Sequence, residues 1–178
     1  NTTGIFVNNN FYNDWRRPAY IEYFEANENT TPISQLGELR VHGGYTRVLA
    51  QKSMAVYSNK RFGTKGFSHP FWEDKPNVTK SKSFVLRNGG NNFTSSRIND
   101  AFCQVLFGNH ADNLDWQAYK PVVCYINGQY HGIYGLRERS NEDIIEANYN
   151  GLEDIDMIEN WEELKSGTID SFNNLVAL

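Results

Sequence analysis

A short basic segment that follows a glycine pair is the first part of the sequence that could do chemistry. The stretch HGGYTRVLAQKSMAVYS, residues 42–58, places Gly43 and Gly44 ahead of Arg47 and then Lys52. Glycines in a turn let backbone N–H groups approach a phosphate closely, and a lysine ammonium is a compact charge that suits phosphate oxygens. These residues predict a phosphate-binding turn. The glycine pair is no Walker motif, and the alternative is a lysine that is simply solvated at a strand edge.

Polar residues crowd a second glycine turn, LRNGGNNFTSSRIND, at residues 86–100. Asp100 lies beside the apolar stripe of a predicted helix, where a carboxylate is often paired. Its candidate partners are Arg97, Arg87 and Lys52. A helix carboxylate that holds a strand lysine would fix the position of that lysine. The alternative is an ordinary turn and helix cap built from Asn and Ser.

A third polar cluster, GLRERSNEDI, occupies residues 135–144. If strand alternation continues there, Glu138 shares a face with Tyr134 and Arg137 points the other way. The alternative is an exposed charge run that pairs with itself. The histidines have no metal-ligand spacing, so no metal site is predicted. No Ser-His-Asp or Cys-His arrangement can be argued from the order of the residues.

Alternation and turn signals indicate which elements would position these clusters. Asn127-Gly128, between two β-rich runs, predicts a hairpin with a type I′ turn over residues 121–136. The other expected strands are 4–8, 19–25, 37–43, 52–58, 83–87 and 154–159, with a turn-rich break at 26–34 and a loop at 62–82. An apolar stripe predicts the main helix through Ile98, Ala101, Phe102, Val105 and Leu106. Shorter helices are expected after Ser140 or Asn141, ending at Gly151, and from residue 168.

This order of elements predicts an α+β fold, with a mostly antiparallel sheet and helices on one side. The 178 residues suffice for one domain with a core, and the formal net charge of −4 argues against a nucleic-acid binder held by a general positive field. No apolar run approaches 18 residues, so no membrane span is expected. Cys103 and Cys124 both lie in apolar segments, which indicates two buried thiols or, alternatively, one disulfide.

Five segments, taken in order, resemble the CotH kinase family over residues 36–159. They are LRVHGGYTRVLAQKSMAVYS, SFVLRNGGNN, SSRINDAFCQVL, DWQAYKPVVCYINGQYHGIYGLRERSNEDII and ANYNGLEDIDMIE. The most specific is VVCYINGQYHGIYGLRER, a tyrosine-rich hairpin that leads straight into an Arg-Glu pair. Each segment alone is weak, but the ordered set is specific.

The resemblance implies the N-terminal lobe and hinge of an atypical, secreted-type protein kinase. Such a protein binds ATP and Mg²⁺ and transfers the γ-phosphoryl group to Ser or Thr of a protein substrate. Lys52 would contact the ATP phosphates, Arg47 would flank them, and Gly43 and Gly44 would form the turn beside them. Supporting roles are expected for Asp100, Arg87, Glu138 and Asn141. The resemblance also implies an exported or cell-surface protein.

The sequence departs from the family pattern where carboxylates are expected. Asn141 stands where members often carry the Asp of Glu-x-x-Asp, and Asn92 stands where an NGGND turn has its Asp. The family's later Asp-rich segment, similar to DxDFG, is not among the 178 residues. We therefore expect a partial domain, with N-terminal strands at 1–35, the matching part at 36–159 and the start of a C-terminal half at 160–178. Catalytic and metal-binding residues would lie beyond Leu178, and this chain alone would be inactive.

A second function is compatible with the same sequence. The chain could be a non-catalytic exported or cell-surface module that binds protein or glycan on a degenerate kinase-like fold. The aromatic residues that could form a sugar-stacking surface are Tyr125, Tyr130, Tyr134, Trp72 and Trp116. The alternative is that these side chains belong to the core and to cross-strand pairs of the hairpin.

Overall fold

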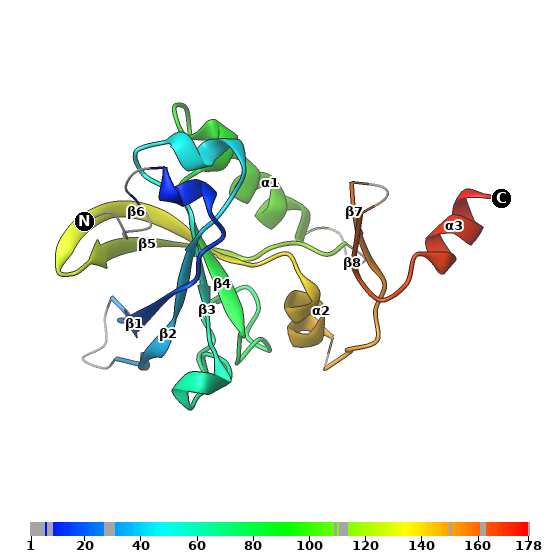
Figure 1. The fold of residues 1–178 in the computed structure, drawn as a ribbon, viewed down its shortest axis with the longest axis horizontal. Helices are drawn as coiled ribbons and strands as arrows, with labels where there is room; N and C mark the ends of the chain where they lie inside the picture. Colours follow the sequence, from blue (N-terminus) through cyan, green and yellow to red (C-terminus); the bar gives the residue numbers. More distant parts are fainter. Residues whose placement is uncertain are drawn as a thin grey trace. The chain divides into compact units, whose positions relative to one another are not determined.

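The computed structural model describes residues 6, 9–26, 31–108, 110, 114–149, 151–160 and 163–177. The chain forms two compact units, Asn1–Arg139 and Ser140–Leu178 (Figure 1). The predicted strand at 4–8 falls, apart from residue 6, outside the described residues.

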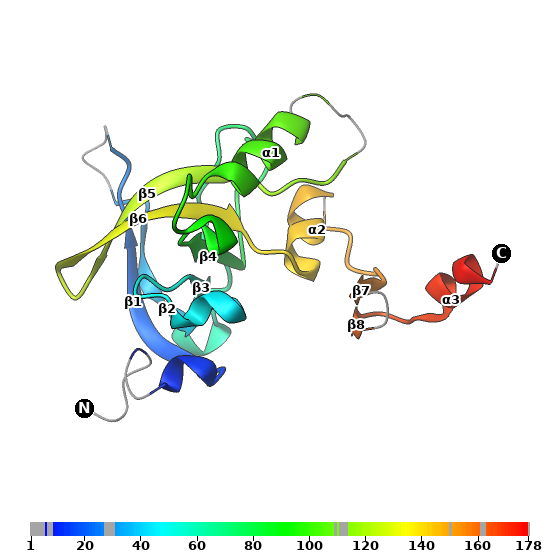
Figure 2. The same ribbon diagram turned by 90° about the horizontal axis from the view of Figure 1, so that it is seen from above.

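An antiparallel sheet forms the first unit. Its six strands lie in the order β1-β2-β3-β4-β6-β5, and every pairing between neighbours is antiparallel. The sheet curls, with β1 and β5 as its two edges (Figure 2). The strands are β1 (Arg17–Tyr23), β2 (Ile33–Val41), β3 (Met54–Tyr57), β4 (Ser83–Arg87), β5 (Tyr119–Ile126) and β6 (Gln129–Glu138). The predicted antiparallel α+β fold is confirmed.

Local sequence explains the hairpin and the central strand. Asn127 and Gly128 join β5 to β6 with φ of 52° and 76°, the left-handed values that a type I′ turn requires. All four residues of β3 are buried because that strand lies inside the sheet. β2 begins at Ile33, four residues before the predicted start, so the turn-rich break is shorter than the sequence indicated.

Much of the core comes from the long loop between β3 and β4. Phe67, Phe71 and Trp72 are all buried, and the ring of Phe71 lies 5.3 Å from the ring of Phe84 on β4. The indole Nε1 of Trp72 donates to the Leu136 carbonyl at 3.2 Å. The loop was expected from its glycines and prolines, but its packing role was not, because its aromatics follow no helical or strand period.

Helix α1 (Asn99–Gly108) forms where the apolar stripe predicts it, but most of that stripe is not buried. Ala101 is buried, whereas Ile98, Phe102 and Leu106 are exposed. The helix meets the sheet through Ala101 and through the ion pairs of Asp100, so its contact with the sheet is largely polar. Helices were predicted to cover one side of the sheet. In the described part of the first unit, α1 is the one α-helix found there.

The two cysteines are free thiols in different environments. Cys103 is exposed on α1, and Cys124 is half-buried on β5. The prediction of two buried thiols is therefore wrong for Cys103, because it lies on the part of α1 that faces away from the sheet, beside exposed Phe102. The disulfide alternative is not realised either.

The second unit contains two short helices and a small hairpin. Its elements are α2 (Glu142–Asn148), β7 (Met157–Glu159), β8 (Glu163–Ser166) and α3 (Asp170–Val176). Gly151, with φ of 87°, follows α2 as predicted. Asn141 occupies the N-cap position, but its amide donates to Asp143 at 2.7 Å instead of its oxygen capping the helix. Strand β8 was not predicted. Among the described helices, none is long and apolar enough to cross a membrane.

Candidate functional site

One face of the sheet gathers positive charge around a row of small residues. The strand register places Arg40 beside Ala55, Ala55 beside Val85 and Val85 beside Arg137. Cross-strand neighbours point to the same face, so Arg40 and Arg137 flank the small apolar residues Ala55 and Val85 on this face, and Tyr119 on β5 follows Arg137. We call this side of the sheet the cationic face.

The imidazole of His42 is buried close to several of these positive charges. Burial first, and then the charges of Arg40, Arg139, Arg87 and Arg47, together lower the pKa of His42 to about 4. The imidazole is therefore neutral at pH 7, because its pKa lies well below that pH. Its Nδ1 is buried without a partner among the described residues. Guanidinium groups from separate elements converge here, which favours an anionic ligand.

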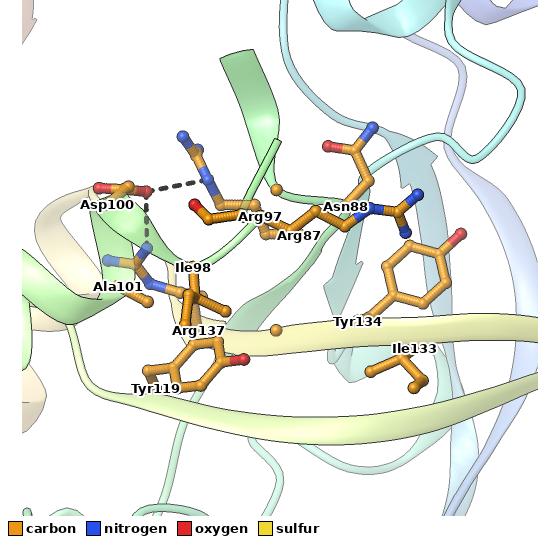
Figure 3. A pocket seen from close by; sticks show the side chains of 13 residues that line it. Arg87, Asn88, Arg97, Ile98, Asp100, Ala101, Tyr119, Ile133, Tyr134 and Arg137 are labelled. Carbon is orange, nitrogen blue, oxygen red and sulfur yellow. Dashed lines mark hydrogen bonds and ion pairs between the residues drawn. The ribbon is translucent and has the colours of Figure 1, made fainter. Parts of the chain in front are cut away.

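A cavity of about 250 Å³ opens where β4 ends and α1 begins (Figure 3). Three arginines line it, Arg87, Arg97 and Arg137, against the single carboxylate of Asp100. A lining with this charge balance suits a ligand that carries several negative charges, because a guanidinium binds phosphate and carboxylate groups through two parallel hydrogen bonds.

Asp100 links two strands to the helix. One oxygen, Oδ2, accepts a hydrogen bond of 2.7 Å from Arg137 on β6 and lies 3.0 Å from Nε of Arg87 on β4 (Figure 3). The side chain of Arg137 is only 3% exposed and also donates to Gln117 at 3.1 Å. Burial lowers the pKa of Arg137, and the Asp100 carboxylate opposes that effect. Asp100 therefore compensates the charge of buried Arg137 and also holds the partly exposed Arg87.

The partners of Asp100 were predicted in part. Arg87 is a partner, as expected, whereas neither Arg97 nor Lys52 pairs with it among the described residues. Arg137 was not considered as a partner. Strand alternation gave a usable signal, since it placed Arg137 on the face opposite Glu138 and so on the face that α1 meets.

The backbone near Arg97 is held in an unusual conformation. Arg97 has φ of 61°, in the left-handed region that residues with side chains rarely adopt. Its Nε donates to the Phe93 carbonyl at 2.9 Å, and its NH1 donates to Gln51 at 3.1 Å. A Cβ at neighbouring Gly89 would lie 2.9 Å from the Arg97 Cβ, so only glycine fits there. The turn thus fixes an arginine at the cavity wall despite local strain.

Asn88 joins this turn to the strand segment that carries Lys52. Its side chain is almost completely buried at 2% exposure. Its amide donates to the Gln51 carbonyl at 2.6 Å, and its oxygen accepts from Ser53 Oγ at 2.8 Å and from the Gly90 N–H at 2.9 Å. The buried side-chain amide of Asn88 therefore holds the asparagine-rich turn in place.

We expect Asn88→Ala to lower the free energy of unfolding by about 2 kcal/mol, because it leaves buried donors and acceptors unpaired. Urea denaturation would measure this loss. Asn91→Ala, which changes an exposed asparagine of the same turn, is the matched control and should stay within about 0.5 kcal/mol of the parent. Equal effects of the two substitutions would contradict the role of Asn88.

The residues predicted to bind nucleotide lie outside the cavity lining. Gly43 has φ of +98°, which suits a glycine turn. The side chain of Arg47 folds over that turn, and its Nε donates to the Gly43 carbonyl. Lys52 is 7% exposed, its Nζ donates to the Leu49 carbonyl at 2.8 Å, and burial lowers its pKa. Both cations also contact the N-terminal segment around Phe11, so they are engaged within the protein.

The Arg-Glu pair after the hairpin is part of the core. Glu138 is buried and accepts from Lys75 Nζ at 2.6 Å and from the Ala118 N–H at 2.9 Å. Arg137 and Glu138 thus have separate partners, and the alternative of an exposed charge run that pairs with itself is wrong for them. The cause is strand β6, which extends through Glu138 inside the sheet.

The five aromatic residues considered for sugar binding do not share one surface. Trp72 and Tyr134 are buried, and Trp116 lies under the ammonium of Lys75 at 4.7 Å. Tyr125 and Tyr130 are exposed and form a cross-strand pair with ring centroids 5.9 Å apart. The alternative of core positions and hairpin pairs therefore describes them better.

Comparison with known families identifies one match over this region. The model of the family described as CotH kinase protein matches residues 39–173, which include both glycine turns, α1 and the β5–β6 hairpin. A search of curated proteins found no match. Within the described residues, no group of three His, Cys, Asp or Glu side chains could hold a metal ion.

Proposed function

This chain belongs to the CotH kinase protein family, and we propose that it is the nucleotide-binding part of a protein kinase. In protein kinases a strand lysine pairs with a helix glutamate, and the lysine contacts the ATP phosphates. Arg87 on β4 and Asp100 on α1 form a strand–helix ion pair of this kind, with an arginine in place of the lysine. This pair is the observation that carries the proposal.

The cavity beside Arg87 supplies the groups that a polyphosphate needs. Arg87 makes no hydrogen bond through its terminal nitrogens to another described residue, and its side chain is 37% exposed. In the proposed complex, Arg87 binds the phosphates, Asp100 orients Arg87, and Arg97 adds a second cation at the cavity wall. Lys52, Arg47, Gly43 and Gly44 belong to the same proposal, as a second turn that precedes β3 at the end of the strand where β4 finishes with Arg87.

The residues fit phosphate better than they fit Mg²⁺. The family implies a divalent ion, which would neutralise charge on the phosphates. The Oδ2 of Asp100 already meets two arginines, and no described acidic cluster surrounds it. The described residues around Asp100 therefore do not form a metal site. Two further points of the proposal rest on family membership alone. They are the transfer of the γ-phosphoryl group to Ser or Thr of a protein substrate, and an exported or cell-surface location.

A calorimetric titration of Mg²⁺–ATP into this chain tests the proposal. Saturable binding is expected. If the chain and its variants release no binding heat, the nucleotide function is wrong, and a non-catalytic module that binds protein becomes the function to test.

The variant Lys52→Ala tests the glycine-turn part of the site. We expect it to weaken nucleotide binding by about 1 kcal/mol, roughly fivefold, because its ammonium already has a carbonyl partner that limits its net gain. Calorimetry with Lys60→Ala, which removes the same charge from an exposed position, provides the control. Unchanged affinity in Lys52→Ala would remove Lys52 from the site.

A further inference from the structure

We propose that residues 9–16 form a strap that competes with nucleotide for the cations of the glycine turn. The strap must leave before Arg47 and Lys52 can contact phosphate. This inference rests on the proposed nucleotide function and adds a means of regulating it.

The strap uses the donors of Arg47 that a phosphate would need. Arg47 NH1 donates to the carbonyls of Phe11 and Tyr12 at 3.3 and 3.1 Å, and NH2 donates to Asp14 Oδ1 at 2.9 Å. Its Nε donates to the Gly43 carbonyl. Oxygen atoms therefore surround every nitrogen of the guanidinium, and three of these oxygens belong to the strap.

Asp14 lies between two arginines as an anionic ligand would. Its Oδ1 is 2.9 Å from Arg47 and 3.5 Å from Arg40, which also belongs to the cationic face. The hydrogen bond from Arg47 holds the pKa of the Asp14 carboxyl below its usual range. Phe11 covers the remaining cation, since the Lys52 ammonium lies 4.1 Å from the centre of its ring. One segment thus engages both predicted nucleotide-binding cations.

The strap is held by polar contacts more than by burial. Its one regular element is a single turn of 3-10 helix, Asn10–Tyr12, with no buried residue. Asp14 is 64% exposed, and the side chains of Tyr12 and Trp15 are exposed as well. A triphosphate carries several charged oxygens where the strap offers one carboxylate, so it can replace the strap at the same guanidinium groups. Binding of the strap and of the phosphates would then be mutually exclusive.

The substitution Asp14→Asn keeps the shape of the side chain and removes its charge. If part of the nucleotide affinity is lost because the strap occupies the site, we expect this variant to bind Mg²⁺–ATP about fivefold more tightly than the parent. Glu22→Gln removes an equal charge from an exposed position of β1 and should leave the affinity unchanged. Calorimetry would measure all three proteins.

The fluorescence of Trp15 supplies a second readout. Trp15 stacks with Arg17 at 4.6 Å and lies next to Asp14 in the chain. Nucleotide should change the tryptophan emission of the parent protein, and Trp15→Phe should remove that change. If Asp14→Asn only lowers the melting temperature, with affinity and emission response like those of Glu22→Gln, Arg47 is a structural anchor and the strap proposal is wrong.

The same measurements separate the two proposals. If the parent binds ATP, Arg87→Ala does not and Asp14→Asn matches Glu22→Gln, then the nucleotide function stands and the strap fails. If neither the parent nor Asp14→Asn binds ATP, both are overturned. Tighter binding by Asp14→Asn, with a nucleotide response that depends on Trp15, supports both.

Discussion

Replacing Asp100 with alanine is expected to lower the free energy of unfolding by about 3 kcal/mol, the largest loss of stability that we predict for one side chain. Arg137 is almost fully buried, and its NH1 donates to Asp100 Oδ2 at 2.7 Å. Without the carboxylate, a buried guanidinium keeps its desolvation penalty and has Gln117 as its remaining acceptor among the described residues. Such an uncompensated charge destabilises far more than the loss of a surface pair.

Urea denaturation of three variants would identify the cause of this loss. Glu22→Ala removes an exposed carboxylate and should change stability by less than about 0.5 kcal/mol. The double variant Asp100→Leu/Arg137→Met removes both charges, so it should recover a large part of the stability lost in Asp100→Ala. A double variant as unstable as the single one would show that the helix contact matters more than the ion pair.

The sheet could be predicted because its signals are local. Residue alternation indicated the strand at 19–25, which overlaps β1, and Asn127-Gly128 located the turn between β5 and β6. The surroundings of α1 could not be predicted in the same way. Its apolar stripe indicated a buried face, but the sheet beside it presents Arg87 and Arg137, so the contact between helix and sheet is made by an aspartate.

The sequence identified several residues of the candidate site, but it did not predict how they pair. The sequence indicated that Asp100 needs a cation and that Arg87 was a candidate, but Arg137 is 37 residues away and only the strand register brings it close. Lys52 was expected to contact phosphate, to pair with Asp100 or to be solvated at a strand edge. Its contact with Phe11 comes from a segment whose position depends on the whole fold. Local patterns thus identify groups able to bind phosphate, while tertiary contacts decide which of them are already engaged.

Removing Arg87 is expected to weaken Mg²⁺–ATP binding by about 1.5–3 kcal/mol, which is roughly 10- to 100-fold. A hydrogen bond from a charged donor is stronger than a neutral one, and the terminal nitrogens of Arg87, which lines the cavity, make no hydrogen bond to another described residue. Stability should change much less than in Asp100→Ala, because the Arg87 side chain is 37% exposed and Asp100 keeps Arg137. A loss of binding in a variant that stays folded would therefore show that Arg87 contacts the nucleotide.

Two further variants make the calorimetric result specific to the guanidinium. Lys65→Ala removes an equal charge from an exposed position, so it accounts for any general change in the protein's field. Arg87→Lys keeps the charge but loses the planar fork, and its affinity should fall between those of the parent and Arg87→Ala. If Arg87→Ala binds as tightly as Lys65→Ala, the phosphates do not bind beside α1. A loss seen in Lys52→Ala alone would then move the site to the glycine turn, where Arg47 and the strap decide access to it.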